Sequence, residues 1–281
     1  MTLTSNIWKN ELTGSGSVLI NVLTVYAEAF DSFICSDINK QLIDTFKEIQ
    51  NNHENLIGML ELIQTFYENL DEKRKEEVYY EYRDIYNKLI QHPETCEEEI
   101  NNIIVKLYKG SCPIDTTSSP TLLTSALFIF LNKTCFRGLY RVNNSGCFNV
   151  PYGNYKKPKI VDSELLRHLH ELFTKNKVEF IVRSYEEVLP KEENVLIYLD
   201  PPYYNTFDNY SMYKFDYNQF EGYLSDIENK NIPFILSNSY DFEEYVKREK
   251  KGLYVEEISI NDRINSKQPA NKRFEILATN F

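Results

Sequence analysis

The chain has 281 residues, 42% of them hydrophobic, and a formal net charge of −11. This length is enough for one large domain or two modest ones with a substantial core, and the acidic balance argues against indiscriminate nucleic-acid binding. No apolar run reaches the 18 residues that a membrane span needs, and the N-terminus lacks the charged and apolar regions of a signal peptide. We therefore expect an intracellular protein with no membrane segment.

A glycine turn at residues 13–17 opens the apolar, helix-like stretch 18–26. The free amides at such a helix start favour a negative or polar ligand. The short apolar segment 33–35 indicates a second strand, and Asp37 follows it about twenty residues past the turn, where an acid can bind ribose hydroxyls. Either a dinucleotide or S-adenosylmethionine would suit this pair. Since the turn lacks the full GxGxxG pattern and the chain has no GxxxxGK[ST] motif, S-adenosylmethionine is favoured.

Residues 40–108 are dense in Glu, Lys, Leu, Ile and Tyr and contain one glycine and one proline, which predicts an almost wholly helical segment. The charged run 69–77 indicates a solvated helix start. A connection rich in Gly, Ser, Thr and Pro follows at 110–120, and residues 122–131 then form an apolar helix by pattern.

The stretch 116–160 contains no acidic residue but has a local charge of +6. Within it, Asn144-Ser145-Gly146 is a hairpin signal between short strand-like pieces. Chance loop composition would explain the charge, but a contact with a polyanion is the favoured interpretation. The six basic residues are Lys133, Arg137, Arg141, Lys156, Lys157 and Lys159.

After residue 160 helices and strands alternate, which predicts a mostly parallel sheet covered by helices. The predicted helices span 163–176, 215–230 and 241–251. The predicted strands span 178–182, 195–199, 233–236, 254–260 and 274–279.

The five cysteines are widely spaced and form no CxxC pair, so free thiols are expected rather than disulfides or zinc. His168 and His170 alternate in an HLH pattern that would also suit a metal site, but a solvated helix surface is the favoured interpretation. No metal site is predicted.

The strand 195–199 is followed at once by Asp200-Pro201-Pro202-Tyr203. Two prolines end the strand, so an acid and an aromatic ring lie at the carboxyl edge of a sheet, where open α/β folds bind ligands. A carboxylate, a main-chain carbonyl and a stacking ring suit a flat base with an exocyclic amine. The alternative is a strand followed by a proline-rich turn without function.

This tetrapeptide resembles the catalytic motif of amino-directed DNA methyltransferases, and three further segments resemble the alpha class (D12 class, Dam type) of adenine-N6 enzymes in family order. The resemblance runs from about Gly14 to the C-terminus, and its specific segments are 132–158, 199–203, 236–240 and 262–280. It implies an α/β, Rossmann-like methyltransferase sheet with an inserted, mostly helical target-recognition domain that carries a β-hairpin. The expected catalytic domain comprises 1–50 and 155–281, and the expected recognition domain comprises 51–154.

The resemblance also implies roles for individual residues. Asp200 and the Pro201 carbonyl would hold the adenine N6 amine, and Tyr203 would stack on the flipped base. The catalytic motif is Asp200, Pro201, Pro202 and Tyr203. The implied contacts with S-adenosylmethionine are Gly14, Ser15, Gly16, Asp37, Ser184 and Asp200. The implied contacts with double-stranded DNA are Lys133, Arg137, Tyr140, Arg141, Asn143, Asn144 and Lys156.

Two departures from the family keep alternatives open. Family members usually carry a K-W-x-G-G-K lid segment before the glycine turn, and the thirteen residues before Gly14 contain none. Ser184 stands where an acid usually receives the adenine amine of the cofactor. A DNA-binding pseudo-methylase with impaired cofactor binding is therefore one alternative, and methylation of RNA or protein amides is another. The family resemblance favours a GATC-like palindrome and a monomer, with a partner chain or dimer as the alternative.

Overall fold

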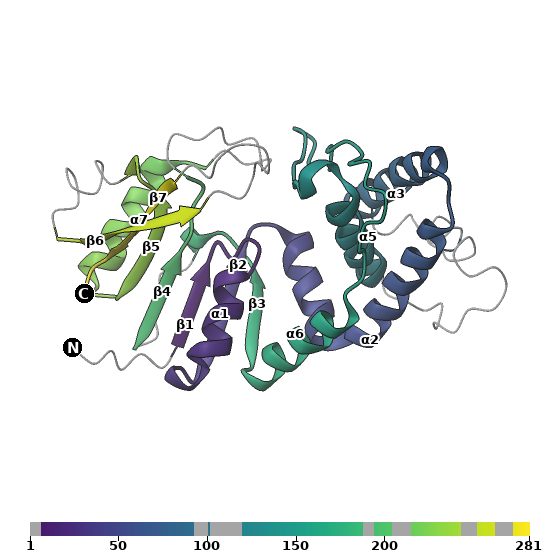
Figure 1. The fold of residues 1–281 in the computed structure, drawn as a ribbon. Helices are drawn as coiled ribbons and strands as arrows, with labels where there is room; N and C mark the ends of the chain where they lie inside the picture. Colours follow the sequence, from purple (N-terminus) through teal and green to yellow (C-terminus); the bar gives the residue numbers. More distant parts are fainter. Residues whose placement is uncertain are drawn as a thin grey trace. The chain divides into compact units, whose positions relative to one another are not determined.

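The computed structural model describes residues 7–92, 101, 120–187, 194–203, 215–242, 252–261 and 272–281 (Figure 1). The chain divides into two compact units, the sheet unit (1–38, 176–208 and 214–281) and the helical unit (39–175 and 209–213). Residues 39–50 and 155–175 thus lie in the helical unit, whereas the expected domain boundaries assign them to the catalytic part. The functions of the two units remain predictions.

The sheet unit is built on seven strands in the order β3-β2-β1-β4-β5-β7-β6. The first five of these strands are parallel, and β7 runs antiparallel to both β5 and β6. The prediction of a mostly parallel sheet is therefore confirmed, and the antiparallel β7 makes the sheet a mixed one. The strands are β1 (Ile7–Glu11), β2 (Ser32–Asp37), β3 (Val178–Val182), β4 (Val195–Leu199), β5 (Phe234–Ser239), β6 (Tyr254–Asn261) and β7 (Lys272–Thr279).

The order of the strands reverses at β1, which pairs with β2 on one side and β4 on the other. Glu11 at its end is in register with Ser36 of β2 and with Leu199 of β4. The carboxyl ends of β1 and β4 therefore meet at the switch point, which is where open α/β sheets bind ligands. The residues of β1 were not named as a strand from sequence, because Lys9, Asn10 and Glu11 are polar although they are buried.

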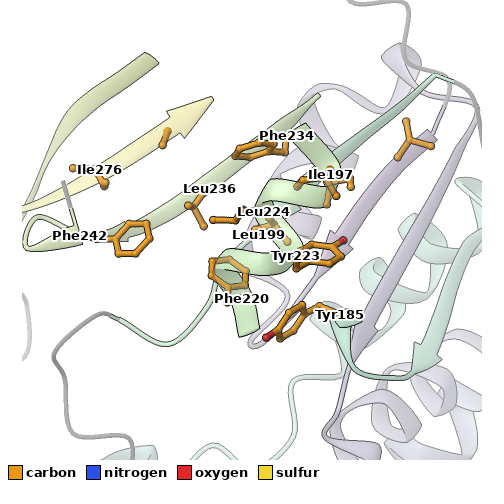
Figure 2. Packing of buried hydrophobic residues seen from close by; sticks show 13 residues of the cluster. Tyr185, Ile197, Leu199, Phe220, Tyr223, Leu224, Phe234, Leu236, Phe242 and Ile276 are labelled. Carbon is orange, nitrogen blue, oxygen red and sulfur yellow. The ribbon is translucent and has the colours of Figure 1, made fainter. Parts of the chain in front are cut away.

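One face of the sheet packs against α7 (Tyr217–Asn229) through an apolar cluster, shown in Figure 2. Alternate residues of a strand point to opposite faces, and Ile197 and Leu199 of β4 and Leu236 of β5 belong to this cluster. Tyr198, Asp200 and Ser237 therefore belong to the opposite face. The helix α1 (Ser17–Val25) also belongs to this unit, as do the short 3₁₀ helices η1 (Ala27–Ala29) and η4 (Tyr185–Glu187).

The helical unit contains α2 (Lys40–Glu68), α3 (Glu72–Gln91), α5 (Pro120–Thr134), η3 (Phe136–Gly138) and α6 (Ser163–Lys175). The predicted helical character of 40–108 is confirmed for its described residues up to 91, which form the two helices α2 and α3 with a break at 69–71. Asp71 caps α3 by accepting a hydrogen bond from the Arg74 amide at 2.9 Å, so the predicted helix start in 69–77 is confirmed. Residues 93–100 and 102–119 lie outside the described residues, as do 243–251 of the predicted helix 241–251.

The predicted hairpin is present in the helical unit. An antiparallel bridge joins Val142 and Phe148, and a second joins Cys135 and Tyr152. The two histidines of the HLH pattern, predicted to lie on a solvated helix surface, have different surroundings. His168 is exposed, whereas His170 stacks on His53 of α2 with ring centroids 3.7 Å apart. None of the helices in the described ranges has the length and apolarity to cross a membrane.

Candidate active site

Asp200 follows β4 directly and is tied to β5. The Ser237 hydroxyl donates a hydrogen bond to Asp200 Oδ1 at 2.7 Å, and the Tyr198 hydroxyl donates to Ser237 Oγ at 3.0 Å. Because β4 and β5 are paired up to Leu199 and Leu236, residues 200 and 237 lie at the next step of the register. The sheet itself therefore sets the position of the carboxylate.

The pKa of Asp200 is raised above its ordinary value. Although the residue as a whole is exposed, surrounding protein atoms desolvate its carboxyl group, which is the largest cause, and the Glu275 carboxylate adds to the shift. The Ser237 hydrogen bond acts in the opposite direction. The ionised form of Asp200 is thus disfavoured by desolvation and by Glu275, and it is stabilised by the hydrogen bond from Ser237.

The other residues of the tetrapeptide are also held by side chains from distant elements. The Tyr203 hydroxyl donates to Glu275 of β7, and the Tyr217 hydroxyl at the start of α7 donates to the Pro202 carbonyl. Asn238 in turn donates to the Tyr217 hydroxyl at 3.3 Å. The Pro202 carbonyl is therefore occupied by a hydrogen bond from Tyr217. The carbonyl that is predicted to accept a hydrogen bond from the adenine amine is the preceding one, that of Pro201.

Sequence reasoning missed several of these partners. Ser237 and Asn238 lie in the motif 236–240, and Glu275 lies in the motif 262–280, so the family-like segments marked them without giving them a role. Tyr198 and Tyr217 had no such signal, because one belongs to an apolar strand pattern and the other to a helix pattern.

The glycine turn lies at the end of β1, beside the end of β2. Gly14 and Gly16 have φ values of 52° and 74°, in the left-handed region that favours glycine. The Gly14 amide donates to Asp37 Oδ2 at 3.0 Å. The Thr13 hydroxyl donates to the Ser36 carbonyl at 3.0 Å, which fixes the turn to β2.

A buried ion pair links the ends of β1 and β3 across β2. Arg183 donates to Glu11 Oε1 at 2.6 Å, and the Ser36 hydroxyl donates to the other Glu11 oxygen. The Arg183 amide also donates to the Asp37 carbonyl at 3.2 Å. Ser184 comes next in the chain and is half-buried, so this ion pair brings the sequence-predicted Ser184 to the same sheet edge as Asp37.

The residues at this edge fit S-adenosylmethionine by their chemistry. At the left-handed glycine turn a Cβ on Gly14 would meet nothing closer than the Leu12 carbonyl at 4.0 Å, so the main chain can be approached closely there. The Asp37 carboxylate can accept hydrogen bonds from a ribose. Asn10 adds a buried amide oxygen that has no hydrogen-bond partner among the described residues.

The predicted DNA contacts all lie in the helical unit, and most are on its surface. Lys133, Arg137 and Lys156 are exposed, as are Arg141 and Asn144. They would contribute positive charge to a surface that lacks acidic residues between 116 and 160.

Three of the hairpin residues have contacts within the protein. Arg141 donates to the Asn149 side chain at 2.7 Å, and Asn143 Oδ1 accepts from the Ser145 amide at 2.9 Å. Tyr140 is half-buried between Phe128 and Phe148. These contacts within the protein stabilise the conformation of the hairpin. They do not test whether the same residues contact DNA, which stays a prediction.

The helix α3 holds the hairpin in place. The Asn87 side chain accepts a hydrogen bond from the Phe148 amide at 2.8 Å and donates one to the Phe148 carbonyl at 3.0 Å. A neighbouring strand would make the same pair of hydrogen bonds. Gln91 donates to the Ser145 carbonyl at 3.1 Å, and Tyr79 donates to the Val150 carbonyl at 2.7 Å. The hairpin therefore projects from a helix instead of a sheet, and sequence reasoning did not find these anchors.

Comparison with known proteins adds independent information. A family model described as D12 class N6 adenine-specific DNA methyltransferase matches residues 12–263. The chain is 31% identical to the type II methyltransferase M.MjaIII of Methanocaldococcus jannaschii, over 95% of this chain and 86% of that relative. It is 26% identical to the DNA adenine methylase of Escherichia coli strain K12, over 80% and 69% of the two chains. It is also 28% identical to the retron Ec67 DNA adenine methylase of Escherichia coli, over 80% and 66%.

Proposed function

The chain belongs to the D12 class of N6 adenine-specific DNA methyltransferases, and we propose that it transfers a methyl group from S-adenosylmethionine to adenine N6 in a short duplex site. The observation that carries the proposal is the sheet edge at the switch point. There the Asp200 carboxylate, held at Oδ1 by Ser237, and the glycine turn held by Asp37 come from strands that are paired side by side. An amine acceptor and a nucleoside site in one unit suit transfer to an exocyclic amine.

In this proposal Asp200 and the Pro201 carbonyl accept hydrogen bonds from the two N6 hydrogens of the adenine, and one of these protons is lost when the nitrogen is methylated and the thioether leaves. The lone pair is then localised on the nitrogen and less delocalised into the ring. The ring of Tyr203, fixed at its hydroxyl by Glu275, stacks on the base. Preorganised acceptors and correct orientation supply most of the acceleration, and no covalent enzyme intermediate is needed.

The cofactor, when bound, supplies an electrophilic methyl group on a sulfonium. The turn formed by Gly14, Ser15 and Gly16 would hold it together with Asp37, and Ser184 would lie at its adenine end. The target base must leave the duplex to be reached, at a cost of a few kcal/mol.

Tritium transfer from labelled S-adenosylmethionine to unmethylated duplex DNA tests the function. We expect label in the DNA, recovered as N6-methyladenine after enzymatic digestion. Parallel reactions with RNA and with protein substrates should give none. If label appears in RNA or protein and is absent from DNA, the proposed substrate is wrong. Calorimetric titration with S-adenosylmethionine addresses the pseudo-methylase alternative, which predicts impaired cofactor binding.

The helical unit is proposed to bind the DNA. Its surface between residues 133 and 159 carries six basic residues and no acidic one, and the hairpin held by α3 projects side chains that suit base edges. Basic residues position a protein on phosphates, and base contacts specify the site. A GATC-like palindrome is the site that we propose to test first.

Replacing Lys133 by alanine should weaken duplex binding to the same degree for all sequences. If Lys133 contacts a phosphate, the slope of log K against log salt should fall by about one. Fluorescence anisotropy between low and moderate salt measures both quantities. Lys73→Ala is the matched control, because Lys73 is an exposed lysine of the same unit outside the acid-free segment. An unchanged slope for Lys133→Ala would remove this residue from the interface.

A further inference from the structure

A chain of hydroxyl groups leads to the catalytic carboxylate from the interior of the sheet. Tyr198 donates to Ser237 at 3.0 Å, and Ser237 donates to Asp200 Oδ1 at 2.7 Å. All three residues lie on the face of the sheet opposite α7, and Tyr198 and Ser237 are each only 8% exposed. The catalytic motif itself contains neither hydroxyl.

The donors of this chain are fixed in place. The Tyr198 ring stacks on the Trp8 ring, with centroids 5.9 Å apart and planes at 17°. Burial, and then the Asp200 charge, raises the pKa of Tyr198 to about 12, so its hydroxyl stays protonated and able to donate near neutral pH. Ser237 accepts that hydrogen bond, which leaves its own proton for Asp200.

We propose that Ser237, supported by Tyr198, is a positioning residue that fixes the Asp200 carboxylate through Oδ1 and thereby presents Oδ2 to the adenine N6 amine. This inference rests on the proposed function. An aspartate with free rotation about its terminal torsion would present either oxygen in a broad range of directions. A donor on the neighbouring strand selects one orientation before the substrate arrives, which is the preorganisation that electrostatic catalysis requires.

The charges around Asp200 make the hydrogen bond more important. From β7, the Glu275 carboxylate disfavours the ionised form of Asp200, and burial acts in the same direction. Two nearby hydroxyls donate to other groups than Asp200. Tyr203, the last residue of the catalytic motif, donates to Glu275, and Tyr198 of β4 donates to Ser237. Ser237 is therefore the described donor that offsets burial and Glu275, because its hydrogen bond lowers the pKa of Asp200.

Because Ser237 donates to Oδ1, a proton bound by Asp200 lies on Oδ2 and blocks the hydrogen bond from N6, so the rate falls as the pH drops through the pKa of Asp200. Removing the Ser237 hydroxyl raises that pKa further. The acid limb of the pH–rate profile should therefore move to higher pH in Ser237→Ala.

The test compares wild type, Ser237→Ala, Ser237→Thr and Tyr198→Phe in single-turnover and steady-state methyl transfer across pH. For Ser237→Ala we expect kcat to fall about ten- to a hundredfold at neutral pH, the effect of losing one hydrogen bond to a charged group, with KM values for DNA and cofactor unchanged. Ser237→Thr keeps a hydroxyl and should restore most of the rate. Tyr198→Phe should shift the acid limb in the same direction but less.

The matched control is Ser225→Ala on α7, where the lost hydroxyl donates to the Glu221 carbonyl and lies away from Asp200. It should leave kcat and the pH profile unchanged. A Ser237→Ala profile with its acid limb at the wild-type position would overturn the proposal. So would an equal loss of rate in Ser237→Ala and Ser237→Thr.

A second measurement separates this inference from the proposed function. Carboxyl-carbon NMR should show Asp200 titrating at higher pH in Ser237→Ala than in wild type, without any need for turnover. If wild type transfers no methyl group, the proposed function fails. If the Asp200 titration is the same in both proteins, the positioning role of Ser237 fails, whatever the activity.

Discussion

Replacing Asp200 by alanine is expected to lower methyl transfer about a hundred- to a thousandfold while the fold is retained, because a preorganised electrostatic contact with the reacting group is worth about that much. The carboxylate is the acceptor whose position the sheet and Ser237 set together. An alanine leaves the N6 amine with the Pro201 carbonyl alone. Single-turnover transfer of tritium to duplex DNA is the measurement.

Stability provides the control for this variant. The raised pKa of Asp200 means that the folded state binds its proton more tightly than the unfolded state. The ionised carboxylate therefore destabilises the folded protein at pH values above that pKa. We expect the melting temperature of Asp200→Ala at alkaline pH to equal or exceed that of wild type. Near-normal transfer in a folded Asp200→Ala protein would exclude the proposed catalytic role.

Replacing Arg183 by methionine is expected to lower the free energy of unfolding by about 3–5 kcal/mol, the usual cost of leaving one partner of a buried ion pair uncompensated. Glu11 is 2% exposed and would keep its charge next to Ser36 without the guanidinium at 2.6 Å. The same change removes a support of the edge that carries Asp37 and Ser184. Urea unfolding measures the stability loss, and calorimetry with S-adenosylmethionine measures the loss of affinity.

Two further proteins sharpen this prediction. The double variant Glu11→Gln/Arg183→Met removes both charges and should recover most of the stability. Arg167→Met is the matched control, because Arg167 pairs with Glu54 on the surface, where an ion pair contributes at most about 1 kcal/mol. If Arg183→Met proves no more destabilising than Arg167→Met, the buried pair does not support the site.

Features that depend on neighbours along the chain could be predicted from the amino-acid sequence. The apolar run 195–199 predicted β4 with the bounds that the structure has, since strand patterns and the two prolines that end them are local. The glycine turn and the tetrapeptide Asp200–Tyr203 could be found in the same way. The helix start near Asp71 was also local, because a cap accepts from an amide three residues later.

Features that join distant segments could not be predicted in this way, because they depend on how the chain folds. β1 did not stand out because a central strand with Lys9, Asn10 and Glu11 breaks the apolar pattern, and its burial depends on partners elsewhere in the chain. Glu11 meets Arg183 at a separation of 172 residues, and Asp200 meets Ser237 at a separation of 37. A sequence shows which residues can carry charge or donate a hydrogen bond. Only the register between β4 and β5, and the order of strands around β1, determines which of them are close enough to act together.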